Sequence, residues 1–181
     1  MKSPRRSPQK NKKSPQKNRS NKKSSYMKDI KYIEYQEDIE KLCNEIYELN
    51  SHIKEDIISN AVFNKNNKIK SWNLSSNDIK SLPESFGYLK IEGNLNLSNN
   101  ELKTLPESFG NITVGGYLDL AHNNLKSLPN SFGNIKLFGS LYLNNNKLEI
   151  LPDSFGNLQV GKLYLQNNNL KTLFSKIFLL L

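Results

Sequence analysis

The feature that most constrains this chain of 181 residues is a hexapeptide that returns at a fixed interval. The motif Leu-Pro-x-Ser-Phe-Gly has a period of 23 residues and begins at Leu82, Leu105, Leu128 and Leu151. A sequence with such a period folds as a stack of similar units, because each unit packs mainly on its neighbours. We therefore interpret the repeat before any other motif.

A longer leucine pattern, L-x-L-x-x-N-x-L-x-x-L, leads into each hexapeptide. It is complete in the copies that begin at Leu95, Leu118, Leu141 and Leu163. The first copy has Trp72 and Ile79 in two leucine positions, and the last copy follows after 22 residues because one residue is missing near Gly161. In L-x-L both leucines point to one face of a short strand, and the residue between them points to the other face.

The asparagine that follows each strand predicts a buried ladder, in which its side-chain amide satisfies backbone groups of neighbouring coils. The next leucines point inward, Pro ends the turn, Phe fills the outer side of the core, and Gly lets the chain reverse. Each unit is thus one coil of a solenoid, and stacking of the coils supplies its stability.

These residues resemble the leucine-rich repeat family. The form L-P-x-S-F-G-N-x-x-V-G-G-x-L-x-L-x-x-N-x-L, over residues 69–177, is similar to the family's short intracellular type. In its style, rich in Asn and Lys with a basic Ser-Pro leader, the chain is also similar to repeat proteins of amoeba-infecting giant DNA viruses. The family resemblance implies an α/β repeat solenoid with parallel β strands on a concave, protein-binding face. Because Gly93, Gly116 and Gly139 stand where many relatives carry Leu, we expect a loose entry into the strands.

The remaining segments complete the predicted domain organisation. We assign about five repeats, of period 22–23, to residues 63–181. Residues 26–62 break the repeat and are predicted to form a helical N-terminal cap over the first coil, either as one helix or as two with a break at Asn50. Its apolar residues follow helical spacing: Ile39, Leu42, Cys43, Ile46, Leu49, Ile53 and Ile57. The alternative is a helix that docks a partner.

The basic character of the chain is confined to its start. Residues 1–25 carry ten Lys and Arg and no acidic residue, whereas the net charge of the whole chain is +9, so residues 26–181 sum to −1. This segment has no aliphatic residue after Met1, and we expect it to be disordered. Its Ser-Pro-x-basic units resemble motifs of histone tails that contact DNA.

Two sets of tail residues follow from that resemblance and from the charge. Candidate polyanion contacts are Arg5, Arg6, Lys10, Lys12, Lys13 and Lys17. Candidate phosphorylation sites for proline-directed kinases are Ser3, Ser7 and Ser14. Phosphorylation would weaken contact with a phosphate backbone, because it removes positive charge from the tail. The alternative is a solubilising leader with non-specific affinity for polyanions.

Catalytic and metal-binding motifs are absent from the sequence. His52 and His122 stand apart from Cys43, and neither a nucleophile elbow nor a phosphate loop occurs. We therefore predict no catalytic residue, no metal and no cofactor, and a protein that is not an enzyme. A lone Cys favours a reducing compartment, and no apolar run reaches the roughly 20 residues of a membrane span. We expect an intracellular protein, cytoplasmic or nuclear, in the host-cell cytoplasm if the chain is viral.

The predicted binding site lies on the outward positions of the strands. Tyr offers rigid amphipathic area, and Asn offers adaptable hydrogen bonds, as in antibody paratopes. The candidate partner-binding residues are Asn96, Tyr117, Asp119, His122, Tyr142, Asn144, Tyr164 and Gln166. The alternative is a solvated sheet of ordinary composition.

The apolar end of the chain, residues 174–181, predicts association. Phe174 stands where earlier coils have Pro, and no polar residue follows to cover the last coil except Ser175 and Lys176. An uncapped apolar end favours a homodimer or marks a truncated array. The leading functional interpretation is a non-catalytic module that binds a protein partner. A nucleic-acid-associated adaptor anchored by the tail is the alternative, and an incomplete repeat copy is the third.

Overall fold

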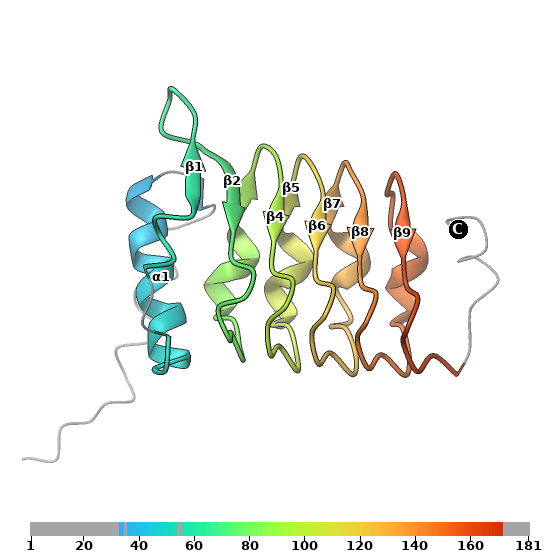
Figure 1. Ribbon diagram of the computed structural model, residues 1–181. Helices are drawn as coiled ribbons and strands as arrows, with labels where there is room; N and C mark the ends of the chain where they lie inside the picture. Colours follow the sequence, from blue (N-terminus) through green and yellow to red (C-terminus); the bar gives the residue numbers. More distant parts are fainter. Residues whose placement is uncertain (1–32, 35, 54–55, 172–181) are drawn as a thin grey trace, which may run out of the picture. The chain divides into compact units, whose positions relative to one another are not determined.

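The computed structural model describes residues 33–34, 36–53 and 56–171, all within one compact unit, Lys31–Leu181. Helix α1 (Gln36–Leu49) comes first, followed by strands β1 (Ala61–Phe63) and β2 (Ile69–Asn73) (Figure 1). The predictions for the basic tail, residues 1–25, and for the apolar end, residues 174–181, lie outside the described residues and stay predictions.

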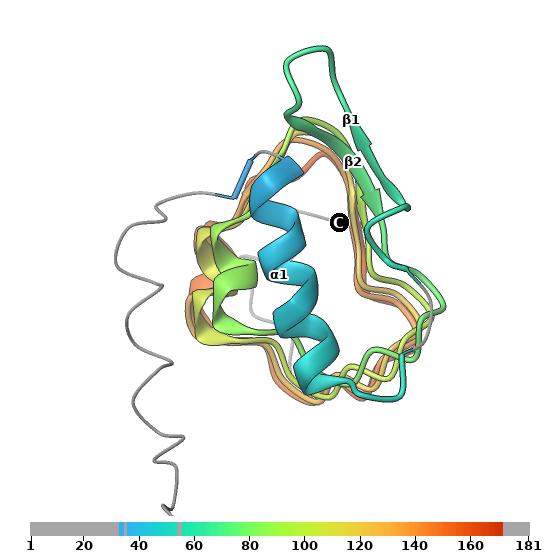
Figure 2. The same ribbon diagram turned by 90° about the vertical axis from the view of Figure 1, so that its left-hand side faces the viewer.

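Each later coil combines short strands with a 3-10 helix. The 3-10 helices are η1 (Glu84–Tyr88), η2 (Glu107–Asn111), η3 (Phe132–Asn134) and η4 (Asp153–Asn157). The strands of the coils are β3 (Lys90–Ile91), β4 (Leu95–Asn96), β5 (Thr113–Val114), β6 (Leu118–Asp119), β7 (Lys136–Leu137), β8 (Leu141–Tyr142) and β9 (Leu163–Tyr164). Figure 2, viewed along the stack, shows the 3-10 helices on the side of the coil that faces the main sheet across the core.

The main sheet runs in the order β1-β2-β4-β6-β8-β9 and is parallel from β2 onward. Its register joins equivalent residues of successive coils: Leu95 pairs with Leu118, Leu118 with Leu141, and Leu141 with Leu163. All four leucines are buried. One repeat therefore forms one coil, and the predicted α/β leucine-rich-repeat solenoid is confirmed.

A column of aromatic rings fills the core behind the sheet. The rings of Phe86, Phe109, Phe132 and Phe155 stack nearly parallel, with centroids 6.0–6.1 Å apart. Trp72 extends the column at the N-terminal end, 6.2 Å from Phe86. All five side chains are buried, so each Phe of the hexapeptide packs on the Phe of the next coil. The predicted role of this Phe is confirmed.

The predicted asparagine ladder is present as well. The amide nitrogen of Asn146 donates to the carbonyl oxygens of Leu120 (2.9 Å) and Leu143 (3.1 Å), and its oxygen accepts from the Leu125 N–H (3.1 Å). Asn100, Asn123 and Asn168 bond the backbone of their neighbouring coils in the same way. Each ladder amide thus joins two coils, and the buried amides of Asn100, Asn123 and Asn146 compensate their own desolvation.

Contrary to the prediction from the sequence, the glycines do not serve to reverse the chain. None of them has a positive φ, so the chain does not use their left-handed freedom to reverse. A Cβ on Gly133 would lie 1.7 Å from the Ser154 carbonyl oxygen, and one on Gly139 would lie 2.4 Å from that of Gly116. Entry into the strands is therefore tight and not loose. The close approach also permits a sheet that the sequence did not predict, β3-β5-β7.

Helix α1 caps the first coil, as predicted, and lies across its end (Figure 2). Four of its own side chains are buried: Ile39, Leu42, Cys43 and Ile46. Burial raises the pKa of the Cys43 thiol to about 12. The helical part of the cap ends earlier than predicted for segment 26–62, because α1 ends at Leu49, which is 47% exposed, and β1 begins at Ala61; residues 26–32 of that segment lie outside the described residues. Within residues 50–53 and 56–62 no second helix forms.

Asn50, where a helix break was predicted, joins the cap to the solenoid. Its side chain is buried and donates to the carbonyl oxygens of Ile46 (2.8 Å) and Ser81 (2.9 Å). Its oxygen accepts from the N–H of Lys80 (2.8 Å) and Ser81 (3.2 Å). The same amide therefore closes the C-terminal end of α1 and satisfies the backbone of the first coil.

Candidate functional site

The register of the main sheet places the predicted partner-binding residues on one surface. We call this surface the sheet face and define it by the outward residues of β2, β4, β6, β8 and β9 together with the residues next to them. The last residues of successive strands pair in one row: Asn73, Asn96, Asp119, Tyr142 and Tyr164. Each of the eight predicted residues is half-buried or exposed, as a contact residue has to be.

Three tyrosines on the sheet face form one aromatic cluster. The ring of Tyr142 lies parallel to that of Tyr164, with centroids 4.6 Å apart and an interplanar angle of 2°. Tyr117 meets Tyr142 at 88°, with centroids 6.0 Å apart. All three are half-buried, which leaves part of each ring accessible to a partner. Strands hold the rings in place, so a partner would bind a pre-formed aromatic surface.

Asn96 and Asp119 close the turns at the ends of their strands. Asn96 Oδ1 accepts from the Ser98 N–H and Asp119 Oδ1 accepts from the Ala121 N–H, both at 2.9 Å. Burial raises the pKa of the Asp119 carboxyl, while the Ala121 N–H and the nearby His122 partly oppose that rise. The Asn96 side chain is thus engaged within the turn, whereas the Asp119 carboxylate keeps a second oxygen.

His122 belongs to a row of residues with left-handed backbone that follow the C-terminal ends of β6, β8 and β9. Its Nε2 lies 3.2 Å from the amide nitrogen of Asn145, whose oxygen accepts from Asn167 Nδ2 at 2.8 Å. These three residues have φ of 54°, 56° and 58°. The left-handed backbone of this row was not predicted, although Ser, Asn or His, types that tolerate this conformation, precede each ladder asparagine.

Asn144 and Gln166 follow the strands that carry Tyr142 and Tyr164, each two residues after the tyrosine. Asn144 is half-buried and Gln166 is exposed. Neither side chain has a hydrogen-bond partner among the residues that the structure describes. Both amides are therefore available to a partner that lies on the tyrosines.

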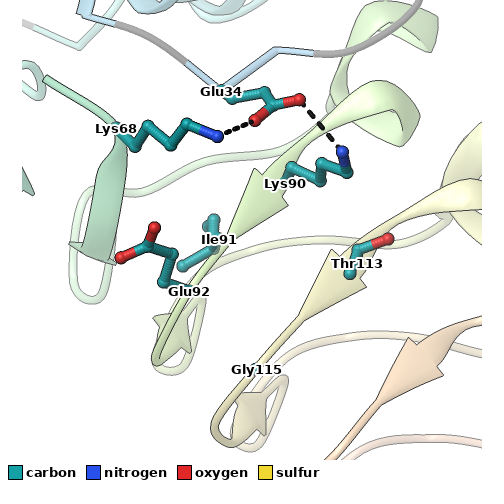
Figure 3. A pocket seen from close by; sticks show the side chains of 7 residues that line it. All are labelled: Glu34, Lys68, Lys90, Ile91, Glu92, Thr113 and Gly115. Atoms are coloured by element: carbon teal, nitrogen blue, oxygen red, sulfur yellow. Dashed lines mark hydrogen bonds and ion pairs between the residues drawn. The ribbon is translucent and has the colours of Figure 1, made fainter. Parts of the chain in front are cut away.

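A charged pocket that the sequence did not predict lies beside the other sheet, β3-β5-β7 (Figure 3). Its volume is ≈ 280 Å³, and Glu34, Lys68, Lys90, Ile91, Glu92, Thr113 and Gly115 line it. The Glu34 carboxylate lies between Lys68 Nζ (3.1 Å) and Lys90 Nζ (3.0 Å). These lysines, Lys90 foremost, lower the pKa of Glu34.

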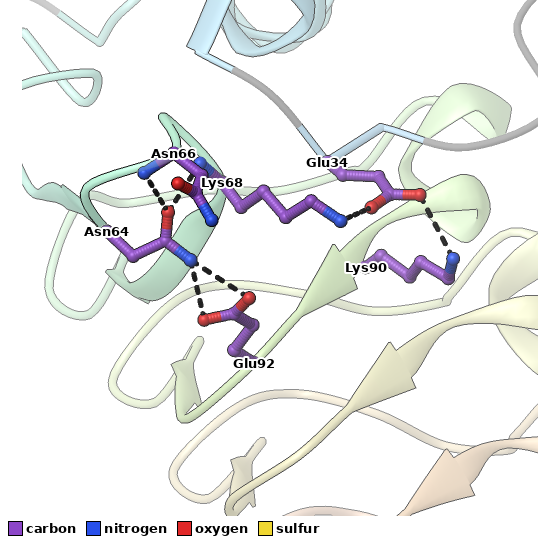
Figure 4. Close-up of polar contacts among 6 residues, drawn as sticks. All are labelled: Glu34, Asn64, Asn66, Lys68, Lys90 and Glu92. Carbon is purple, nitrogen blue, oxygen red and sulfur yellow. Dashed lines mark hydrogen bonds and ion pairs between the residues drawn. The ribbon is translucent and has the colours of Figure 1, made fainter.

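The pocket's polar groups bind one another. Asn64, in the turn between β1 and β2, donates to both carboxylate oxygens of Glu92 at 2.9 Å, and its oxygen accepts from the Asn66 and Lys68 N–H groups (Figure 4). The segment that holds Glu34 runs beside β3, where the Ile33 N–H donates to the Tyr88 carbonyl oxygen at 2.8 Å. We attribute to this cluster a structural role in tying the cap and the β1-β2 turn to the first coil.

Other classes of site lack support in the described part of the chain. Over residues 33–34, 36–53 and 56–171, His, Cys, Asp and Glu side chains do not gather in threes as metal ligands. In the same residues no helix is long and apolar enough to cross a membrane. The predicted polyanion contacts and phosphorylation sites all lie in residues 1–25, outside those that the structure describes.

The comparisons with known proteins agree with the coil structure. A family model described as Leucine Rich Repeat matches three consecutive segments, residues 94–112, 117–135 and 139–158. These segments hold β4, β6, β8 and the 3-10 helices that follow them. A search of curated proteins found no match.

Proposed function

Because the chain belongs to the leucine-rich repeat family, we propose that it is a non-catalytic recognition module that binds a protein partner on its sheet face. Repeats of this family commonly mediate protein interactions. The observation that carries the proposal is the aromatic cluster, in which Tyr142 stacks on Tyr164 and meets Tyr117 at a right angle. Half-buried tyrosines held on a rigid sheet are typical anchors of protein interfaces.

The dimensions of the sheet face limit the partner. Five strands, from β2 to β9, at a spacing of about 4.8 Å span about 20 Å. Such a surface accommodates an extended peptide segment or the edge of a small domain. The register supports a fixed arrangement, because Leu141 and Leu163 are anchored in the core beneath Tyr142 and Tyr164.

The titratable groups of the sheet face argue for recognition over catalysis. His122 Nε2 is hydrogen-bonded to Asn145, and Asp119 Oδ1 is hydrogen-bonded to the Ala121 N–H. A catalytic site needs an acid or base that reaches a nucleophile in a sheltered cavity. We therefore propose that these side chains bind and orient a partner.

A capture experiment tests the proposed function. Tagged full-length protein is used to isolate partners from the native cells, and the purified partner is then titrated with wild type and with Tyr142→Ala/Tyr164→Ala. We expect the double variant to bind at least about 30-fold more weakly, because two aromatic anchors are lost. The control is Tyr88→Ala, in η1 on the far side of the coil, which should bind as wild type. Equal binding by the double variant would remove the proposal.

A second candidate function rests on the charge distribution. With +10 on residues 1–25 and −1 on the rest, we propose that the tail can add affinity for nucleic acid. The test compares wild type with a full-length variant whose ten tail Lys and Arg are replaced by Gln, each titrated with duplex DNA over a range of salt. Loss of binding and of its salt dependence in the variant is the expected result. Equal binding by both proteins would exclude a role for the tail.

A further inference from the structure

The negative charge of Asp119 is not required by the turn that it closes. At the equivalent position one coil earlier, Asn96 accepts the same kind of bond from Ser98, and two coils earlier Asn73 accepts it from Ser75 at 3.1 Å. A neutral amide oxygen thus makes this turn as well as a carboxylate does. Among the described residues Asp119 forms no salt bridge. Its charge therefore remains available to a partner.

Two tyrosines are neighbours of Asp119 on the sheet face. Tyr117 stands two residues before Asp119, so both side chains point to the same face of the sheet. Tyr142 pairs directly with Asp119 across the β6-β8 ladder. The two rings meet at 88°, with centroids 6.0 Å apart. Tyr164 stacks on the side of Tyr142 that points to β9, so the other side of that ring points to the strand of Asp119.

This arrangement has the chemistry of a cation site. The face of an aromatic ring attracts an ammonium or guanidinium group, and a carboxylate beside it adds a charge-assisted hydrogen bond. An apolar side chain in the same place would desolvate Asp119 without compensation, and an acidic one would be repelled. Lys162 is an exposed basic residue of the sheet face. It lies in the same row as Tyr117 but two strands away, with Ser140 between them, and within the described chain it forms no salt bridge with Asp119.

We infer that the corner formed by Tyr117, Asp119 and Tyr142 binds a Lys or Arg side chain of the partner protein. The inference rests on the proposed function and names the partner's chemistry. The rings hold the aliphatic stem and the face of the cationic group, and the carboxylate binds its N–H groups. The neighbouring Tyr142-Tyr164 stack then packs against the adjacent part of the partner.

The test uses defined probes and the full-length chain. Blocked tripeptides Gly-X-Gly, with X as Lys, Arg, norleucine or Glu, are titrated to about 50 mM, since a single side chain binds in the millimolar range. NMR follows the Ala121 amide, which bonds to Asp119, and the ring protons of Tyr117 and Tyr142. We expect the Lys and Arg peptides to shift these signals along a saturable curve and to bind about fivefold more tightly than norleucine.

Asp119→Asn is the decisive variant, because asparagine makes the same turn at the two preceding coils. We expect it to weaken the Lys peptide about three- to fivefold and to leave norleucine unchanged. Asp153→Asn, in η4 and away from the sheet face, is the matched control and should behave as wild type. Equal affinity of Asp119→Asn for the Lys peptide, equal binding of norleucine, or no shift in wild type would each overturn the inference.

Two further arms identify the source of the cation and separate this inference from the proposed function. If replacement of the ten tail Lys and Arg by Gln tightens Lys-peptide binding, the chain's own tail occupies the corner and the assignment to a partner is wrong. Unchanged affinity supports it. If Tyr142→Ala/Tyr164→Ala abolishes partner binding while Asp119→Asn leaves the Lys peptide unaffected, the inference fails and the proposed function stands.

Discussion

The ring of Tyr164 lies parallel to that of Tyr142, 4.6 Å away, although the coil between them has 22 residues where the preceding coils have 23. The missing residue falls in the turn before β9, and the pairing of Leu141 with Leu163 is kept. The ladder also continues, because Asn168 bonds the carbonyl oxygen of Leu143 at 2.9 Å. The turn thus absorbs the deletion, and the strand-borne tyrosines remain in register.

The first prediction concerns the asparagine ladder. Asn146→Ala leaves the Leu125 N–H and the carbonyl oxygens of Leu120 and Leu143 without these partners, so we expect the free energy of unfolding to fall by about 2–4 kcal/mol. Urea unfolding followed by the fluorescence of Trp72, the one Trp, measures it. Asn124→Ala is the control, because no side-chain hydrogen bond of Asn124 exists in the described chain, and it should cost less than about 0.5 kcal/mol.

The second prediction concerns the close approach of coils at glycine. In Gly133→Ala the new Cβ would lie 1.7 Å from the Ser154 carbonyl oxygen, so η3 and η4 have to separate. We expect a loss of about 2–4 kcal/mol in stability. In Gly161→Ala the nearest atom would be 3.5 Å away, and the change should be nearly neutral. Similar thermal unfolding temperatures for the two variants would contradict the assigned packing.

The third prediction is a pH dependence that comes from Asp119. Its folded pKa is raised from 3.8 because burial disfavours the charged form, so this group's contribution to stability is fully present below that value and is lost as pH rises through the folded pKa. Asp119→Asn should therefore match wild type near pH 3 and be more stable at pH 7, by less than about 1 kcal/mol. Denaturant unfolding at both pH values measures the difference. A stability difference that does not change with pH would refute this assignment.

The fourth prediction uses Cys43 to report on the cap. The thiol is buried and its pKa is raised to about 12, so we expect a disulfide reagent at pH 8 to react with it only when α1 detaches. Asn50→Ala removes the bonds to Ser81 and Lys80 and should raise the rate at least about tenfold. His52→Ala, which loses one exposed bond to the Asp78 carbonyl oxygen, is the control. Rapid labelling of wild type would show that the cap is not stably docked.

The sequence predicted those parts of the structure that recur in every coil. Strand, ladder asparagine and stacked Phe occupy the same position of each repeat, and the alternation of side chains along a strand placed Tyr117 and Asp119 on one face. The right angle between the rings of Tyr117 and Tyr142 could not be predicted. It depends on the side-chain rotamers of two residues that belong to different coils. The paired charges around Glu34 were missed for a related reason, since they join segments far apart in the chain.

Three features of the structure were not predicted from the repeat pattern: the role of Asn50, the second sheet and the role of the glycines. Asn50 is a residue type that often ends a helix, and a helix break was all that the sequence predicted there. Only the structure shows that its side-chain amide forms hydrogen bonds with the backbone of the first coil. The sheet β3-β5-β7 was missed because two-residue strands have no alternation to detect. The glycines were assigned to chain reversal, whereas their role is to let neighbouring backbones approach.

Photo-cross-linking tests the central claim, recognition of a protein on the sheet face, most directly. Tyr142→benzoylphenylalanine and, as control, Tyr88→benzoylphenylalanine are introduced into the full-length chain, and both proteins are irradiated in native cell extract. The account predicts a light-dependent covalent adduct with a protein from position 142 and little or none from position 88. Adducts of equal yield from both positions, or an adduct from position 88 alone, would contradict it.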